Sequence, residues 1–167
     1  MGSSGITPAP STAAFVLGRL QDYLAKLNTE RNTGLSTYDL EWAVLAVAKK
    51  VYKIYQEGGF EQVMQPAAFR CVRQVEHLVG SNTIMTVHPS VQEKIIAADK
   101  DGTIQRRSAI NDNVDEDAVA RVARALPEFR LAYEIDALEP KDFGRYGGVI
   151  MTLDCFEVTG WQKLASF

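Results

Sequence analysis

Apolar residues recur at helical spacing along most of the chain. In "FVLGRLQDYLAKL", which begins at Phe15, they return every three or four positions and predict an amphipathic helix. The same spacing runs through residues 36–57, and two glycines then favour a helix end. Ser36 is followed three residues later by Asp39, which resembles a helix-capping pattern. The chain is therefore predicted to be mainly helical.

Beyond those glycines the pattern alternates between short strands and helices. The predicted order is strand 60–64, helix 69–80, strand 82–89 and helix 90–99. Pro66 ends the first strand, and such an alternation predicts two strands that pair in parallel. Ligands of such units bind beyond the carboxyl ends of the strands. Arg70 follows the first strand and His88 lies at the carboxyl end of the second, so both are candidates for function.

The two ends of the chain differ from this middle part. Residues 1–13 are rich in glycine, serine and proline and are expected to form a flexible leader before one domain over residues 14–167. The last third is helical with charged connections, and it finishes in an amphipathic stretch. The sequence "DKDGTI" resembles a calcium loop, but Ala97 and Ser108 stand where its first and last oxygen ligands belong. We expect a turn there and no metal site.

Composition and charge narrow the function classes. The 167 residues are 46% hydrophobic and 23% charged, with a formal net charge of −3, so a nucleic-acid partner is not expected. Two cysteines without metal spacing make a disulfide framework unexpected and favour a reducing compartment. No apolar run has the length of a membrane helix. A cytoplasmic protein is expected.

Two segments share a longer pattern with one known family. They are "FVLGRLQDYL" at residues 15–24 and, at residues 51–95, "VYKIYQEGGFEQVMQPAAFRCVRQVEHLVGSNTIMTVHPSVQEKI". The second segment resembles the seventh and eighth strand–helix units of the transaldolase family. The first is similar to the family segment that follows the sixth strand, with one residue inserted. The match covers about the middle half of the chain, and the last third matches less well.

The resemblance implies a (β/α)₈ barrel with a Schiff-base lysine on its fourth strand, which moves a three-carbon ketol unit between sugars. The first five strands have no counterpart here. The expected fold is therefore an α-rich α/β protein, a truncated TIM-barrel remnant with two short parallel strands and mostly helices. The eight lysines all fall on predicted helix faces or in loops, whereas a Schiff-base lysine requires a depressed pKa. Transaldolase chemistry by this chain alone is not expected, nor is a cofactor.

The phosphate end of the family site is matched in outline. The resemblance assigns Arg19 and Arg70 to the two arginines that hold the substrate phosphate, a role that suits the planar guanidinium. The family serine is replaced by Ala68 and the family glycine by Pro66, so this anion site would be weakened. The alternative is structural: Arg70 would satisfy a local carboxylate or carbonyl, and Arg19 would lie on an ordinary helix.

His88 departs from the family, which has a small residue before the proline of this motif. Its imidazole would stand at the end of the strand beside that of Arg70, and a histidine that titrates near neutral pH suits general acid or base catalysis. The alternative is a surface histidine that caps the next helix.

Three functions remain open at this stage. The first is a repurposed enzyme acting on a small phosphorylated or carbonyl-bearing metabolite, in which Arg70 holds an oxygen and His88 moves a proton. The second is a catalytically inactive binding or regulatory protein. The third is transaldolase activity completed by a partner chain that supplies the missing half-barrel. Two strands alone leave unpaired edges, so a homodimer is also expected.

Overall fold

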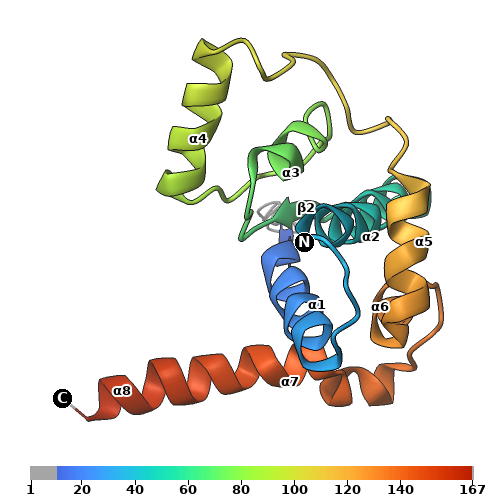
Figure 1. Ribbon diagram of the computed structural model, residues 1–167, viewed down its shortest axis with the longest axis vertical. Helices are drawn as coiled ribbons and strands as arrows, with labels where there is room; N and C mark the ends of the chain where they lie inside the picture. The colour runs from blue at the N-terminus through green and yellow to red at the C-terminus, as the bar shows by residue number, and fades with distance from the viewer. Residues whose placement is uncertain (1–10, 167) are drawn as a thin grey trace, which may run out of the picture. The chain divides into compact units, whose positions relative to one another are not determined.

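The computed structural model describes residues 11–166. It is a mainly helical α/β structure with two short parallel strands (Figure 1). The elements are β1 (Thr12–Phe15), α1 (Leu17–Arg31), α2 (Thr37–Gly58), β2 (Val63–Pro66), α3 (Val72–Glu76), α4 (Pro89–Lys100), α5 (Glu116–Ala125), α6 (Pro127–Tyr133), the 3₁₀ helix η1 (Pro140–Arg145), α7 (Gly147–Asp154), the π-helical η2 (Cys155–Trp161) and α8 (Gln162–Ala165). The expected α-rich α/β class is confirmed.

The chain divides into two compact units. Among the described residues, unit 1 contains residues 11–16 and Ala48–Ile110, and unit 2 contains Leu17–Val47 and residues 111–166. Strand β1 begins at Thr12, so the last two residues of the expected leader belong to a strand. Residues 1–10 of that leader lie outside the described residues.

Unit 1 is built on the parallel pair β1–β2. Thr12 is the register partner of Val63, and Phe15 is the register partner of Pro66. The Ala67 N–H donates to the Phe15 carbonyl at 2.9 Å and extends this ladder beyond β2. The helical period predicted a helix from Phe15, but the helix begins at Leu17 because the preceding residues pair with β2.

The second predicted strand forms two isolated parallel bridges to β2 instead of a continuous ladder. They join Met64 to Thr83 and Ala67 to Thr86. The Thr86 N–H donates to the Pro66 carbonyl at 2.9 Å, but Pro66 has no N–H to return a bond to the same neighbour. One ladder bond is thereby missing, which explains why residues 83–86, here called the 83–86 segment, are bridged and not fully paired.

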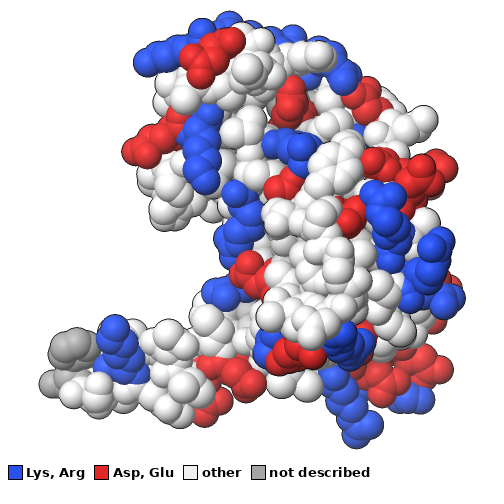
Figure 2. Space-filling view, in the orientation of Figure 1, with Lys and Arg blue, Asp and Glu red and all other residues white. Residues whose placement is uncertain are grey.

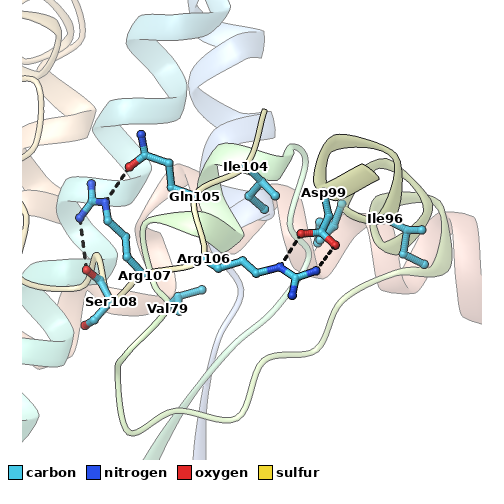
Figure 3. Close-up of a pocket in the computed structure, with 9 residues that line it drawn as sticks. Val79, Ile96, Asp99, Ile104, Gln105, Arg106, Arg107 and Ser108 are labelled. Atoms are coloured by element: carbon cyan, nitrogen blue, oxygen red, sulfur yellow. Dashed lines mark hydrogen bonds and ion pairs between the residues drawn. The ribbon is translucent and has the colours of Figure 1, made fainter. Parts of the chain in front are cut away.

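The connection after α4, residues 101–115, is hydrogen-bonded to the turn after α3. The N–H groups of Ala109 and Ile110 donate to the Val79 carbonyl at 2.9 and 3.1 Å. Gly80 adopts φ +89°, and a Cβ added there would lie 1.9 Å from Ser108 Oγ. Both the backbone angle and the close approach require glycine at this position. The result is a fixed wall for a pocket between α4 and this connection (Figure 3).

Unit 2 has an apolar core drawn from α1, α2, α5 and α6. Its buried side chains are Leu17, Tyr23, Leu24, Leu27, Leu40, residues 42–47, Ala118, Val119, Val122, Leu126 and Phe129. Full burial of a leucine or phenylalanine contributes about 1.5–3 kcal/mol. Helix α1 also packs against α7, and α5 against α6.

The C-terminal helical segment, α7 to α8, keeps much of its apolar surface exposed. Leu153, Phe156, Trp161 and Leu164 are each more than half exposed. Most of this segment is white in Figure 2, whereas lysine, arginine and acidic side chains alternate over much of the rest of that face. The amphipathic stretch that the sequence predicted therefore forms helix, but these four side chains stay outside a core. Among the described residues, no helix is long and apolar enough to cross a membrane.

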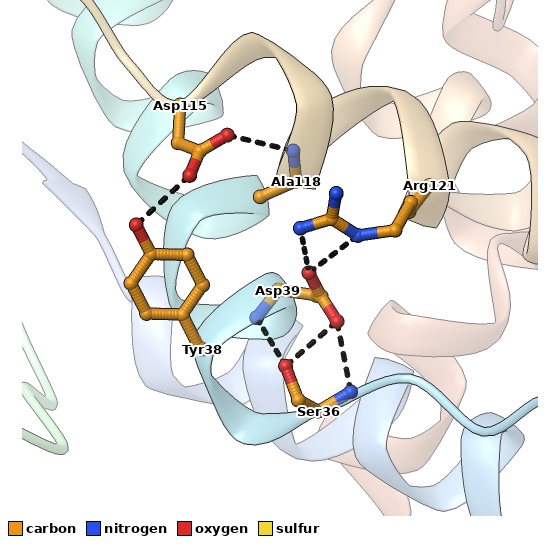
Figure 4. A network of polar contacts seen from close by, with 6 residues as sticks. All are labelled: Ser36, Tyr38, Asp39, Asp115, Ala118 and Arg121. Carbon is orange, nitrogen blue, oxygen red and sulfur yellow. Dashed lines mark hydrogen bonds and ion pairs between the residues drawn. The ribbon is translucent and has the colours of Figure 1, made fainter.

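The start of α2 is held by a buried carboxylate (Figure 4). Asp39, only 5% exposed, accepts from Ser36 N–H at 2.9 Å and from Ser36 Oγ at 2.7 Å. Its other oxygen accepts from Arg121 Nε and Nη2 at 2.9 and 2.7 Å. Burial alone would raise the pKa of Asp39, but the hydrogen bonds from Ser36 and Arg121 more than offset this, so the pKa lies below its ordinary value. The predicted capping pattern is confirmed.

This network predicts a pH-dependent loss of stability in Asp39→Asn. The variant should lose about 1–3 kcal/mol of unfolding free energy near neutral pH, because it removes a buried, hydrogen-bonded charge. The folded pKa lies below the unfolded value of about 3.9, so the contribution is present above that value and is lost as pH falls through the folded pKa. Urea unfolding of both proteins at pH 7 and pH 3 measures the change.

Glu157→Gln is the matched control, because Glu157 is an exposed carboxylate in the same unit. It should leave the unfolding free energy nearly unchanged at both pH values. An Asp39→Asn deficit that is equally large at pH 3 would contradict the proposed role of the charge.

Candidate functional site

Two sequence-predicted site residues of unit 1 follow neighbouring parallel segments. The bridge from Ala67 to Thr86 aligns the end of β2 with the end of the 83–86 segment. Arg70 lies three residues beyond this bridge on one side, and His88 lies two residues beyond it on the other. Parallel neighbours lie about 4.8 Å apart, so both segments leave the bridge in the same direction. Both side chains are exposed.

The backbone that carries Arg70 is tightly held. Ala68 adopts φ +60°, a left-handed conformation that is uncommon for a residue other than glycine. The Arg70 N–H donates to Oε1 of the fully buried Gln74 at 2.7 Å, and Arg70 Nη1 donates to the Ala68 carbonyl at 3.2 Å. Strained backbone of this kind is frequent at functional sites. The chain thus fixes the direction in which it leaves β2.

His88 is the N-cap of α4. Its Nδ1 accepts the Ser90 N–H at 3.2 Å and lies 2.8 Å from Ser90 Oγ. Ser90 supplies the bonded N–H, and His88 is the acceptor. Because Nδ1 accepts, the proton of a neutral imidazole lies on Nε2. The capping alternative for His88 is therefore observed, and Nε2 remains as the atom that a ligand would meet.

Gln65 links the three parallel segments through its side chain and was not singled out from the sequence. Its Oε1 accepts from Thr12 Oγ1 at 2.8 Å, and its Nε2 donates to Thr86 Oγ1 at 2.9 Å. A polar residue between two buried ones, Met64 and Pro66, is the signal that could have identified it. This amide aligns both neighbours of β2 on one face.

Arg19, the other sequence-predicted arginine, belongs to α1 in unit 2. Its Nη1 donates a hydrogen bond to Cys155 Sγ at 3.5 Å, and its guanidinium carbon lies 5.5 Å from the centre of the Phe156 ring. Arg19 therefore contacts η2 through a cation–π arrangement. The helix alternative considered for this residue agrees with these contacts.

The sequence predicted the lysines on helix faces or in loops, and in the structure all eight lie in helices. They are Lys26, Lys49, Lys50, Lys53, Lys94, Lys100, Lys141 and Lys163. Lys49 is partly buried, and its Nζ donates to the Ala109 carbonyl at 2.7 Å. A protonated amine bound to a carbonyl is a poor nucleophile. Within residues 11–166 no cluster of three metal-binding side chains occurs either.

The comparisons with known proteins bear on this arrangement. The family model described as Transaldolase/Fructose-6-phosphate aldolase matches residues 6–137, well over half of the chain. The chain belongs to this family. Searches of curated proteins and of solved structures found no match.

The match confirms that the chain resembles the transaldolase family, as its sequence motifs predicted. The matched region of this transaldolase-family chain includes Arg19, Arg70 and His88, and it reaches well beyond the middle half that the sequence motifs covered. The match ends before η1, so the exposed C-terminal segment α7 to α8 lies outside it. The helical α/β structure with two short parallel strands is consistent with a partial barrel domain of the family.

The cap geometry predicts different effects for two substitutions of His88. His88→Ala should lower the unfolding free energy by about 1 kcal/mol, because the Ser90 N–H loses its acceptor. His88→Asn should retain most of the stability, because asparagine is a favoured N-cap. Urea unfolding of the three proteins measures the difference, and equal losses in the two variants would show that the cap contributes nothing.

Proposed function

We propose that this transaldolase-family chain binds a small anionic or carbonyl-bearing metabolite at the carboxyl ends of β2 and the 83–86 segment, and converts it without a Schiff base. Arg70 would hold an oxygen of the ligand, and His88 would exchange a proton with it. The observation that carries the proposal is the parallel bridge between Ala67 and Thr86, which aligns the two chain ends that bear these side chains.

The chemistry of the two groups suits these roles. A guanidinium offers several N–H donors in one plane and binds carboxylate or phosphate oxygens well. Arg70 Nη1 donates a hydrogen bond to the Ala68 carbonyl, which is neutral, and an anionic ligand can replace this contact. When the ring is neutral, the Nε2–H of His88 can hold an oxygen of the ligand. Transfer of a proton from Nε2 requires the protonated ring, in which Nδ1 no longer accepts the Ser90 N–H, so proton transfer and the helix cap exclude each other.

We assign β1, β2 and the 83–86 segment to the sixth, seventh and eighth strands of the family barrel. Their parallel order β1–β2–83–86 supports this assignment, since consecutive strands of such a barrel are parallel neighbours. Active sites of this fold lie at the carboxyl ends of the strands. Arg70 and His88 lie just beyond those ends in β2 and the 83–86 segment.

A catalytically inactive binding or regulatory protein is the second candidate. The observation that favours it is that both side chains also have local structural roles: Arg70 donates to the Ala68 carbonyl, and His88 caps α4. Under this alternative a sugar phosphate would bind but would not be converted.

The proposal predicts separable effects of Arg70 and His88. With fructose 6-phosphate, the sugar phosphate in the family's name, as the probe, Arg70→Ala should weaken binding by about 1.5–3 kcal/mol, the range for hydrogen bonds to charged groups. His88→Asn, which keeps the helix cap, should lower turnover with little change in binding. Calorimetry and product analysis measure the two effects, and Arg73→Ala on α3 is the control for loss of a nearby cation.

Borohydride reduction in the presence of the same ketose phosphate distinguishes the alternatives. No lysine adduct is expected by mass spectrometry, because no lysine lies in β1 or β2. An adduct would contradict the proposal and favour Schiff-base chemistry, completed by a partner chain. Binding without any conversion would leave the second candidate.

We also propose that two copies of the chain associate. Among the described residues, β1 and the 83–86 segment each pair with β2 alone, so each has an outer edge. Unpaired edges of this kind favour pairing with another chain.

Light scattering should therefore give a mass near twice 18.5 kDa at micromolar concentration. Ala14→Lys places a charge on the exposed side of β1 and should shift the mass toward the monomer. Glu93→Lys, on the exposed part of α4, is the control for an added positive charge. A wild-type mass near 18.5 kDa would refute the dimer.

A further inference from the structure

Unit 1 contains a second concave site, separate from Arg70 and His88. It lies between α4 and the connection that follows it, and it has a volume of about 570 Å³. Its lining consists of Val79, Ile95, Ile96, Asp99 and residues 104–108. This volume falls within the range of about 300–1,000 Å³ found for small-molecule sites.

The pocket combines an aliphatic floor with a charged rim (Figure 3). The aliphatic floor consists of four lining residues, Val79, Ile95, Ile96 and Ile104. Ile96 is 55% exposed and Val79 is 40% exposed, so part of this floor is open to a ligand. Burial of such surface stabilises a complex by about 25 cal/mol per Å² before the costs of association.

The charges at the rim are unequal. The lining residues include two guanidinium groups, Arg106 and Arg107, and one carboxylate, Asp99. Arg106 Nε donates to Asp99 Oδ1 at 2.7 Å, and its Nη2 donates to Oδ2. The Arg106 side chain is 82% exposed, so this ion pair faces water and is weak enough to be exchanged. A ligand carboxylate or phosphate can therefore take the place of Asp99 beside Arg106.

The wall that carries the arginines is fixed before any ligand arrives. The Gln105 N–H donates to Glu76 Oε1 at 2.9 Å, and the bonds from Ala109 and Ile110 to the Val79 carbonyl hold its other end. Little ordering of the backbone is then required on binding, which reduces the cost of association.

We propose that this pocket binds a small amphipathic anion, with its apolar body on the isoleucine floor and its carboxylate or phosphate on Arg106 in exchange for Asp99. An uncharged apolar ligand would use the floor but not the rim, and a simple inorganic anion would use the rim but not the floor. The proposal does not depend on the function proposed for Arg70 and His88, because neither residue lines the pocket.

Titration of the ¹⁵N-labelled full chain with octanoate tests the site, and 1-octanol serves as the neutral ligand of the same chain length. Octanoate should shift the amide resonances of residues 95–108 and bind at least about threefold more tightly than octanol, as a solvent-screened charged contact allows. Ile96→Ser should weaken both ligands, since it shortens the apolar floor.

The exchange with Asp99 gives the sharpest test. Asp99→Asn should tighten octanoate binding severalfold and leave octanol unchanged, because Arg106 loses its competing carboxylate. Arg106→Gln should weaken octanoate severalfold and also leave octanol unchanged. Arg124→Gln, an exposed cation on α5 in unit 2, is the matched control and should alter neither affinity.

Three outcomes would overturn the proposal. The first is equal affinity for octanoate and octanol. The second is resonance shifts centred on other residues, such as the exposed apolar side chains of α7 to α8. The third is octanoate affinity that is unchanged or weakened in Asp99→Asn while that variant unfolds at the wild-type urea concentration.

Discussion

The pairing of β2 on both of its sides is the constraint on which unit 1 depends. Four residues bring together a strand from the start of the chain and a segment that lies after α3. Met64 and Pro66 are buried, while Gln65 between them bonds outward to both neighbours. Everything proposed for the carboxyl ends follows from this alignment, because a shift of one residue would exchange the buried and polar positions.

Local sequence patterns predicted much of this fold, and long-range pairing accounts for what they missed. The spacing of apolar residues in α2 and the capping by Ser36 and Asp39 depend only on residues that are close together in the sequence. By contrast, β1 has four residues without a strong strand pattern and forms because β2 is available to pair with it. The 83–86 segment was predicted as a strand, and the missing donor of Pro66 limits it to isolated bridges.

The candidate site shows the same division. Arg70 and His88 were predicted from their place at the carboxyl ends of strands, and the structure adds local contacts to the Ala68 carbonyl and to Ser90. The alternation of one polar residue with buried neighbours was visible at Gln65, but its two hydrogen-bond partners come from distant segments. Likewise, no local pattern predicts the ion pair between Arg106 and Asp99, because their proximity depends on how the chain turns after α4.

The hydrogen bonds from Ala109 and Ile110 to the Val79 carbonyl also determine how this part of unit 1 opens locally. The amide protons of Ala109 and Ile110 share a single carbonyl acceptor, so both are released by the same local separation. Their hydrogen-exchange rates should then report one cooperative event, distinct from fraying at the end of α4. A residue larger than Gly80 would press against Ser108, the neighbour of Ala109, and should therefore lower the free energy of that opening.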